Sequence, residues 1–255
     1  MIEAPRQPTK LPHPARPAAS FRVIVTLQDK YINQEKPMNV IELDRRRLLK
    51  GMALGMAAWF VPGVYAEELA RTPAMTEGPF YPDRLPLDTD NDLIVIGNST
   101  TPAVGDITNL TGRVLTRAGS PVNNATVEIW QVDNNGAYLH TGTTNAARRD
   151  PNFQGFGRFT TGQRGEYRFR TIKPVPYPGR TPHIHVKVKQ GDRTLLTTQL
   201  FIAGHAQNAQ DGIYRGAGGI IARELVTVDF RRVANSRIVE FNANFDIVLG
   251  VTPAG

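Results

Sequence analysis

The segment HIHVKVKQGDRTLLTTQLF, residues 183–201, decides how this chain is expected to fold. Residues 183–189 and 194–201 are rich in β-branched and apolar side chains, which is typical of strands. The tripeptide Gln190-Gly191-Asp192 between them is a turn signal. The segment therefore predicts a β-hairpin.

Other short strand patterns lie on both sides of this hairpin. The longest is residues 239–249, where apolar side chains occupy every second position, which predicts one half-buried strand. Further strands are expected at residues 110–116, 125–132 and 165–170. A short helix is expected only around residues 209–214. These patterns predict an all-β protein, an antiparallel β-sandwich of about eight strands with long active-site loops.

The N-terminal region has a different composition. Asp44-Arg45-Arg46-Arg47-Leu48-Leu49-Lys50 precedes an apolar run at residues 51–61 and the small residues around Ala66, an order typical of a cleavable secretory signal. The spacing of the arginines, leucines and lysine resembles the twin-arginine motif. A transmembrane anchor is the alternative, but about a dozen apolar or small residues fall short of the roughly 20 that span a bilayer.

This pattern predicts export to the periplasm or beyond the cell, without a stable membrane anchor. Residues 1–66 are expected to be a disordered extension followed by the signal, and residues 67–255 a single catalytic domain. Both Met1 and Met38 are candidate start residues, and Met38 would place the arginine pair nearer to the N-terminus.

The net charge of +7 does not indicate a nucleic-acid partner, because it is concentrated in the expected signal region. Residues 1–66 hold ten Lys and Arg against five Asp and Glu, whereas residues 67–255 hold twenty against eighteen. The chain has no cysteine, which excludes disulfides, thiolate metal sites and cysteine nucleophiles.

Four side chains are candidates for a metal site. His183 and His185 are two positions apart in a predicted strand, so both imidazoles point to one face and can converge on a metal. Such a pair also occurs by chance on surface strands. Tyr177 lies between two prolines in a stiff segment that is not a strand, and Tyr138 follows the strand at 125–132. For each tyrosine alone, a packed aromatic ring with its hydroxyl hydrogen-bonded is the alternative.

The motifs around these residues resemble the intradiol ring-cleavage dioxygenases, the family of protocatechuate and catechol dioxygenases. The resemblance covers residues 76–205 and is carried by the following segments: Thr76-Glu77-Gly78-Pro79-Phe80-Tyr81, Val127-Glu128-Ile129-Trp130-Gln131, Gly136-Ala137-Tyr138, Asp150–Arg158, Phe169–Pro174, Pro176-Tyr177-Pro178, Arg180–His185 and Thr198-Gln199-Leu200-Phe201.

The resemblance implies a non-haem iron(III) enzyme that cleaves catechol-type rings between the two hydroxylated carbons. It implies an ortho-diphenol and O2 as substrates and a muconate-type diacid as product. By analogy, Tyr138 and His185 would be the equatorial ligands of the iron, and Tyr177 and His183 the axial ones. Tyr177 would leave the metal when substrate binds and accept a proton from it.

The resemblance also implies roles for two further residues. Arg180 would stabilise negative charge on the substrate ring, and Gln199 would orient Arg180. From position alone, Arg180 reads as a surface arginine, while His140 and His205 read as loop histidines. Gly179 stands where protocatechuate enzymes carry a tryptophan, and the long N-terminal helical segment of catechol dioxygenases is absent, so substrate and oligomeric state stay open. The alternatives to an enzyme are a β-sandwich binding module and an inactive iron-binding relative.

Overall fold

The structure is a computed structural model that describes residues 68–143 and 145–250. The described residues all belong to one compact unit, Val61–Gly255. The expected signal at residues 1–66 lies outside the described residues. Within the described part of the chain, no helix has both the length and the apolar character needed to cross a membrane.

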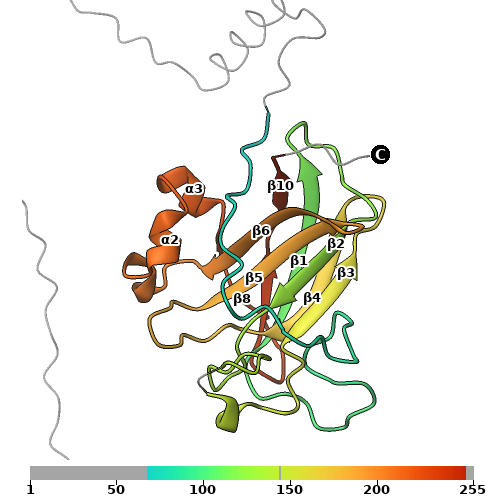
Figure 1. Cartoon of the computed structure of the whole chain (residues 1–255), viewed down its shortest axis with the longest axis vertical. Coiled ribbons are helices and arrows are strands. Elements are labelled where there is room, and N and C mark those ends of the chain that lie inside the picture. The colour runs from blue at the N-terminus through green and yellow to red at the C-terminus, as the bar shows by residue number, and fades with distance from the viewer. Residues whose placement is uncertain (1–67, 144, 251–255) are drawn as a thin grey trace, which may run out of the picture. The chain divides into compact units, whose positions relative to one another are not determined.

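Two sheets form the body of the protein (Figure 1). The strands are β1 (Ile107–Thr116), β2 (Thr126–Trp130), β3 (Phe156–Thr160), β4 (Glu166–Ile172), β5 (His183–Gln190), β6 (Arg193–Ile202), β7 (Thr227–Val228), β8 (Arg231–Arg232), β9 (Glu240–Asn244) and β10 (Ile247–Leu249). One sheet has the order β3-β2-β5-β6-β7. The other has the order β10-β1-β9-β8, with β4 also paired to β1.

The helical segments are short. They are the 3₁₀ turns η1 (Ala146–Arg148) and η2 (Ala206–Ala209) and the α-helices α2 (Gly212–Gly216) and α3 (Ile220–Glu224). The helix expected around residues 209–214 is present as the end of η2 and the beginning of α2, whereas α3 was not predicted. Asp211 caps α2, because its carboxylate accepts hydrogen bonds from the first backbone N–H groups of that helix.

The expected β-sandwich is confirmed, and eight of the ten strands in the described residues are three residues or longer. The hairpin predicted at residues 183–201 is β5 paired antiparallel with β6. The pairing is not antiparallel throughout, however, because β9 and β10 run parallel to β1 and β7 runs parallel to β6. Both sheets are therefore mixed.

The strand predicted at residues 239–249 is interrupted between β9 and β10. At Phe245 and Asp246 the backbone leaves regular pairing with β1. The Asp246 carboxylate instead accepts a hydrogen bond from the backbone N–H of Arg113 at 2.9 Å. The alternation of apolar residues continues through this break, because Phe245, Ile247 and Leu249 are all buried. Sequence periodicity alone could not reveal the interruption.

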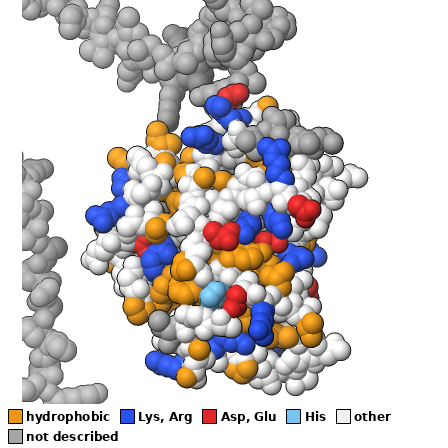
Figure 2. Space-filling model, viewed as in Figure 1, with side chains coloured by type: hydrophobic (Ala, Val, Ile, Leu, Met, Phe, Trp, Pro, Cys, Tyr) orange, Lys and Arg blue, Asp and Glu red, His pale blue; other side chains and the backbone are white. Residues whose placement is uncertain are grey.

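Two hydrophobic clusters fill the interior. The larger one lies between the sheets and includes Leu110, Ile129, Phe169, Ile184 and Ile247. The smaller one contains buried Trp130, Val132, Tyr138 and Phe156, with Phe80, Tyr81, Leu139, Val175 and Tyr177 packed against it. This second cluster is aromatic and lies where β2 ends and β5 begins. On the face drawn in Figure 2, basic and acidic side chains are interspersed around apolar ones.

An N-terminal strap, defined here as residues 72–81, crosses the β5–β6 hairpin (blue-green in Figure 1). The backbone N–H of Met75 donates to the carbonyl of Thr197 at 2.8 Å, and the hydroxyl of Thr198 donates to the carbonyl of Pro73 at 2.7 Å. The Gln199 amide donates to the carbonyl of Thr76 at 3.1 Å. Residues 73–76 of the strap are therefore bound to β6.

Gly112 in β1 should be intolerant of any side chain. A Cβ at this position would lie 2.0 Å from the carbonyl oxygen of Phe245 and 2.8 Å from the ring of Tyr167. Because a backbone carbonyl cannot move without breaking the sheet, Gly112→Ala should lower the free energy of unfolding by about 3 kcal/mol. Denaturant unfolding measures this change.

Gly216 in α2 is the matched control, because a Cβ there would meet nothing within 4 Å. Gly216→Ala should leave stability unchanged or raise it slightly. Equal stabilities for the two variants would show that β1 does not pack against Phe245 as described.

Candidate active site

Four candidate side chains from three segments of the chain meet in one small space. The hydroxyl of Tyr138 lies 3.2 Å from Nε2 of His183, 3.1 Å from Nε2 of His185 and 3.4 Å from the hydroxyl of Tyr177. The two Nε2 atoms are 3.2 Å apart. The structure thus brings together all four residues that the sequence analysis proposed as metal ligands.

The two histidines are held as neutral imidazoles. Both rings are buried, and burial is the main cause that lowers the pKa of His183 to about 3 and the pKa of His185 well below its ordinary value. Nδ1 of His183 lies 2.7 Å from the carbonyl oxygen of Thr181. A carbonyl can only accept, so Nδ1 carries the proton and the lone pair of Nε2 faces the cluster.

Tyr138 is the centre of the cluster and is 2% exposed. Its pKa is raised well above the ordinary value, first by burial and then by the neighbouring Tyr177 hydroxyl. The loop that carries Tyr138 is fixed by Asp133, whose carboxylate accepts from the backbone N–H of Ala137 at 2.9 Å. The ring of Phe80 from the strap stacks on Tyr138 with centroids 4.9 Å apart.

His185 is held by packing on Trp130. The two rings are parallel within 11° with centroids 4.7 Å apart, because Trp130 in β2 and His185 in β5 are paired residues. Nδ1 of His185 has no hydrogen-bond partner among the described residues. Gly78 of the strap lies close by, since a Cβ added there would be 3.6 Å from Cε1 of His185. Sequence reasoning did not assign this role to Trp130.

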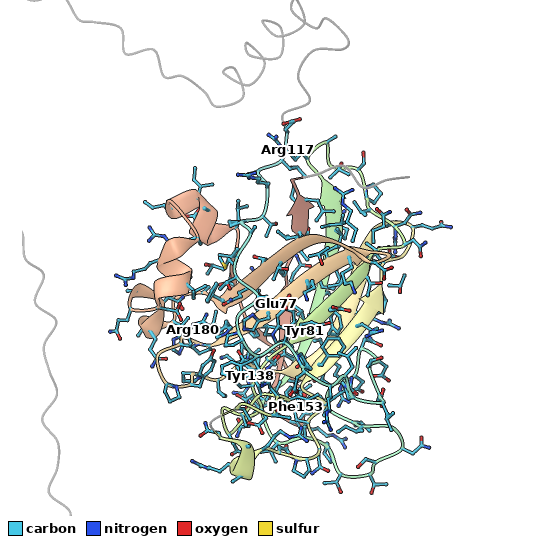
Figure 3. All side chains as sticks on the ribbon, viewed as in Figure 1. Glu77, Tyr81, Arg117, Tyr138, Phe153 and Arg180 are labelled. Atoms are coloured by element: carbon cyan, nitrogen blue, oxygen red, sulfur yellow. The ribbon has the colours of Figure 1, made fainter. Side chains whose placement is uncertain are left out.

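Arg180 is not a surface arginine, because its side chain is 18% exposed and all three of its nitrogens are bonded. Nη1 donates to the hydroxyl of Tyr177 at 3.3 Å, and Nη2 donates to Oε1 of Gln199 at 2.6 Å. Nε donates to Asp211 at 2.9 Å. The expected contact between Gln199 and Arg180 is present. Tyr138 and Arg180 are labelled in Figure 3, and they come from different segments of the chain.

The donor set suits a hard trivalent cation. Two imidazole lone pairs and two phenol oxygens converge in a small space. No carboxylate lies among these four side chains, so the two phenols, once deprotonated, would supply the negative charge that balances the cation. The described residues contain no group of three His, Cys, Asp or Glu side chains that could hold a metal. Phenolate oxygen together with imidazole nitrogen is a combination that favours iron(III). These residues therefore fit the metal that the sequence resemblance implies.

The two other histidines among the described residues, His140 and His205, lie outside this cluster. Nδ1 of His140 accepts from the backbone N–H of Gly142 at 2.9 Å, and His205 caps η2. Gly179, beside Arg180, has open space where a side chain would point. Asp211 was missed by sequence reasoning, because it is 31 residues from Arg180 in a segment without a recognisable motif.

The comparisons with known proteins point to one family. The pattern of the dioxygenase family matches residues 76–251. The beta chain of protocatechuate 3,4-dioxygenase from Burkholderia cepacia is 37% identical over 173 residues, covering 64% of this chain and 72% of that protein. Hydroxyquinol 1,2-dioxygenase from Corynebacterium glutamicum is 29% identical over 154 residues, covering 53% of this chain and 48% of that protein. The chain thus spans about half the length of this second relative.

A solved structure shares both sequence and fold with this chain. It is the dioxygenase domain of a dioxygenase and carbohydrate-binding protein fusion from Streptomyces sp. SirexAA-E. The two are 32% identical with a TM-score of 0.54, and the match covers 72% of this chain and the whole of that domain.

A partly buried ion pair attaches the strap to the sheet beside this site. The ammonium of Lys187 in β5 pairs with Glu77 of the strap and lies 3.6 Å from the ring centroid of Tyr81. The Tyr81 hydroxyl donates to buried Glu128 at 3.0 Å. Burial, followed by the charge of Glu128, raises the pKa of Tyr81 above its ordinary value. The labelled Glu77 and Tyr81 can be followed in Figure 3.

Removal of this ion pair should loosen the strap. Lys187→Met should lower the free energy of unfolding by about 1–2 kcal/mol, less than for a fully buried pair because Glu77 is 43% exposed. It should also speed hydrogen exchange in residues 72–81. Lys189→Met is the control, since Lys189 is more exposed and lies 4.0 Å from Glu128. Equal exchange rates in the two variants would contradict a strap held by Lys187.

Proposed function

This chain belongs to the dioxygenase family, and from that premise we propose that it is a non-haem iron(III) enzyme that cleaves catechol-type rings between the two hydroxylated carbons with O2. The proposed substrate is a small ortho-diphenol, and the product is a muconate-type diacid. One observation carries the proposal: the hydroxyl oxygens of Tyr138 and Tyr177 and the Nε2 atoms of His183 and His185 form one cluster. Neighbouring atoms in it are 3.1–3.4 Å apart.

These four residues would hold the iron. Bound there, iron(III) would supply Lewis acidity and a template for both oxygens of the diphenol. His183 offers the lone pair of Nε2, because its Nδ1–H is committed to Thr181. Stacking on Trp130 keeps the ring of His185 in place. Tyr138, the most central of the four, would bind as phenolate, since a nearby cation offsets the burial that raises its pKa.

The remaining side chains orient the substrate and handle its proton. Tyr177 is half-buried, and its hydroxyl oxygen accepts from the hydroxyl of Tyr138 at 3.4 Å and from Nη1 of Arg180 at 3.3 Å. Its hydroxyl oxygen is therefore suited to accept a proton from an incoming diphenol. Arg180 keeps a fixed positive charge beside that oxygen, where it can stabilise negative charge on the substrate ring. Open space at Gly179 leaves room beside these groups.

Oxygen consumption tests the proposed reaction against both alternatives. The iron-loaded protein should consume one O2 per catechol and place both oxygen atoms of labelled O2 in the diacid. A binding module would hold no iron, and an inactive relative would hold iron without consuming O2. A panel of catechol, protocatechuate and hydroxyquinol would then identify the preferred ring substituent.

The colour of the protein should report the two tyrosines. Phenolate bound to iron(III) absorbs visible light, so the purified iron-loaded protein should be red to burgundy. Tyr138→Phe should reduce iron retention, because Tyr138 contacts three other members of the cluster. Tyr177→Phe should keep iron but turn over slowly, since it removes the proposed proton acceptor. Metal analysis and visible spectra measure these effects. A colourless protein with stoichiometric iron, or full activity of either variant, would contradict the assignment.

We also propose export by a twin-arginine-type signal within residues 1–66. The support is the sequence pattern around Arg45 and Arg46. Replacing both residues with Lys should leave the precursor inside the cell, because the receptor reads the paired guanidinium groups. Fractionation of cells that express the full chain measures this. Efficient export of the double variant would point to a different route.

A further inference from the structure

Asp211 is a buried carboxylate whose bonds reach both a helix and the candidate active site. Its side chain has no exposed surface. Oδ1 accepts from the backbone N–H groups of Ile213 and Tyr214, each at 2.9 Å. Oδ2 accepts from Nε of Arg180 and from the backbone N–H of Thr181, also at 2.9 Å each. Every oxygen is thus used twice, and the two oxygens serve different parts of the protein.

The Oδ2 atom controls two groups that contact the proposed ligands. Arg180 directs Nη1 to the hydroxyl of Tyr177, and its guanidinium plane is fixed by Asp211 at Nε and by Gln199 at Nη2. Thr181 offers its carbonyl to Nδ1 of His183. A single carboxylate therefore fixes the direction of the arginine and binds the backbone N–H of the residue whose carbonyl orients one imidazole.

We propose that Asp211 is a positioning residue for ring cleavage, which holds the Arg180 guanidinium against Tyr177 and anchors the backbone of Thr181, whose carbonyl orients His183. This inference rests on the proposed function and extends it beyond the ligand cluster. Asp211 does not touch the cluster itself, so it acts only through Arg180 and Thr181.

The surroundings of Asp211 favour its charged form and bond both of its oxygens. Burial alone would raise its pKa, but hydrogen bonds from Tyr214, Thr181 and Arg180, with the charge of Arg180, lower the pKa below the ordinary value. The α2 helix that Asp211 caps packs on β6, because the rings of Tyr214 and Phe201 lie 5.1 Å apart. The carboxylate is thus attached to a segment that packs against the sheet.

Asp211→Asn separates the two tasks of the carboxylate. An amide oxygen can still cap α2, but its NH₂ group then faces the N–H groups of Arg180 and Thr181, where it can only oppose them. The variant should keep iron and lower kcat by on the order of 10²-fold, with KM changed by less than about threefold. Asp150→Asn is the matched control: Asp150 is buried, and among the described residues its carboxylate accepts from the backbone N–H groups of Val104 and Asn152 and from no side chain.

Added methylguanidinium tests whether Asp211 acts through Arg180. Arg180→Ala should leave a space lined by Asp211 and Gln199, so millimolar methylguanidinium should restore part of its kcat and raise its melting temperature. The double variant Arg180→Ala/Asp211→Asn should show neither effect, because the carboxylate that would bind the guanidinium is gone. Arg180→Ala/Asp150→Asn should still respond to methylguanidinium.

Two further arms keep the test decisive. Arg180→Lys keeps Asp211, so its result does not depend on whether the Asp211→Asn variant folds. A single ammonium group cannot replace the three separate nitrogens with which Arg180 bonds Asp211, Tyr177 and Gln199. The kcat of Arg180→Lys should therefore fall nearly as far as that of Arg180→Ala. The effect of methylguanidinium on the melting temperature is also measured on the iron-free full chain. It reports whether Asp211 binds the guanidinium even if the protein cleaves no ring.

Wild-type kcat in Asp211→Asn or in Arg180→Lys would overturn the proposal. So would a methylguanidinium response in the double variant. A wild-type protein that binds iron but cleaves no diphenol would instead refute the proposed function, while the melting temperatures still decide whether Asp211 binds the guanidinium.

Discussion

The structure depends on the convergence of four uncharged donor groups in a buried space. The hydroxyl of Tyr138 lies within 3.4 Å of two imidazole nitrogens and of the Tyr177 hydroxyl. The single hydroxyl proton of Tyr138 cannot satisfy all of these acceptors at once, and buried polar groups without partners are costly. A cation that binds the four lone pairs would remove this cost. Four features keep these oxygen and nitrogen atoms together: the β2–β5 register, the Tyr138 loop, the strap and the hydrogen bonds of Arg180.

The supports of the cluster differ for each member. His183 is fixed by a hydrogen bond, His185 by stacking on Trp130, and Tyr138 by a turn built on Asp133 and by the strap residue Phe80. Each side chain of a metal site usually needs such an outer partner to fix its orientation. In this protein the partners come from strand β2, from loops between strands and from the N-terminal strap, so no single element of the sandwich forms the site alone.

Sequence patterns predicted the parts of this arrangement that depend on local spacing. The two-residue separation of His183 and His185 placed both imidazoles on one face, and the flanking prolines indicated that Tyr177 lies outside a strand. The patterns could not reveal contacts made across long separations. Asp211 meets Arg180 only because η2 and α2 fold back beside β6, and Trp130 meets His185 through strand register. The parallel return of β9 and β10 was missed because alternation does not encode strand direction.

The central claim is that these four side chains hold a metal ion. Anomalous diffraction at the iron absorption edge, from crystals of the iron-loaded protein, tests it most directly. We predict one peak about 2 Å from Nε2 of His183, Nε2 of His185 and the hydroxyl oxygens of Tyr138 and Tyr177. A protein that carries stoichiometric iron but shows its peak at His140 or His205, or shows none at the cluster, would contradict the account.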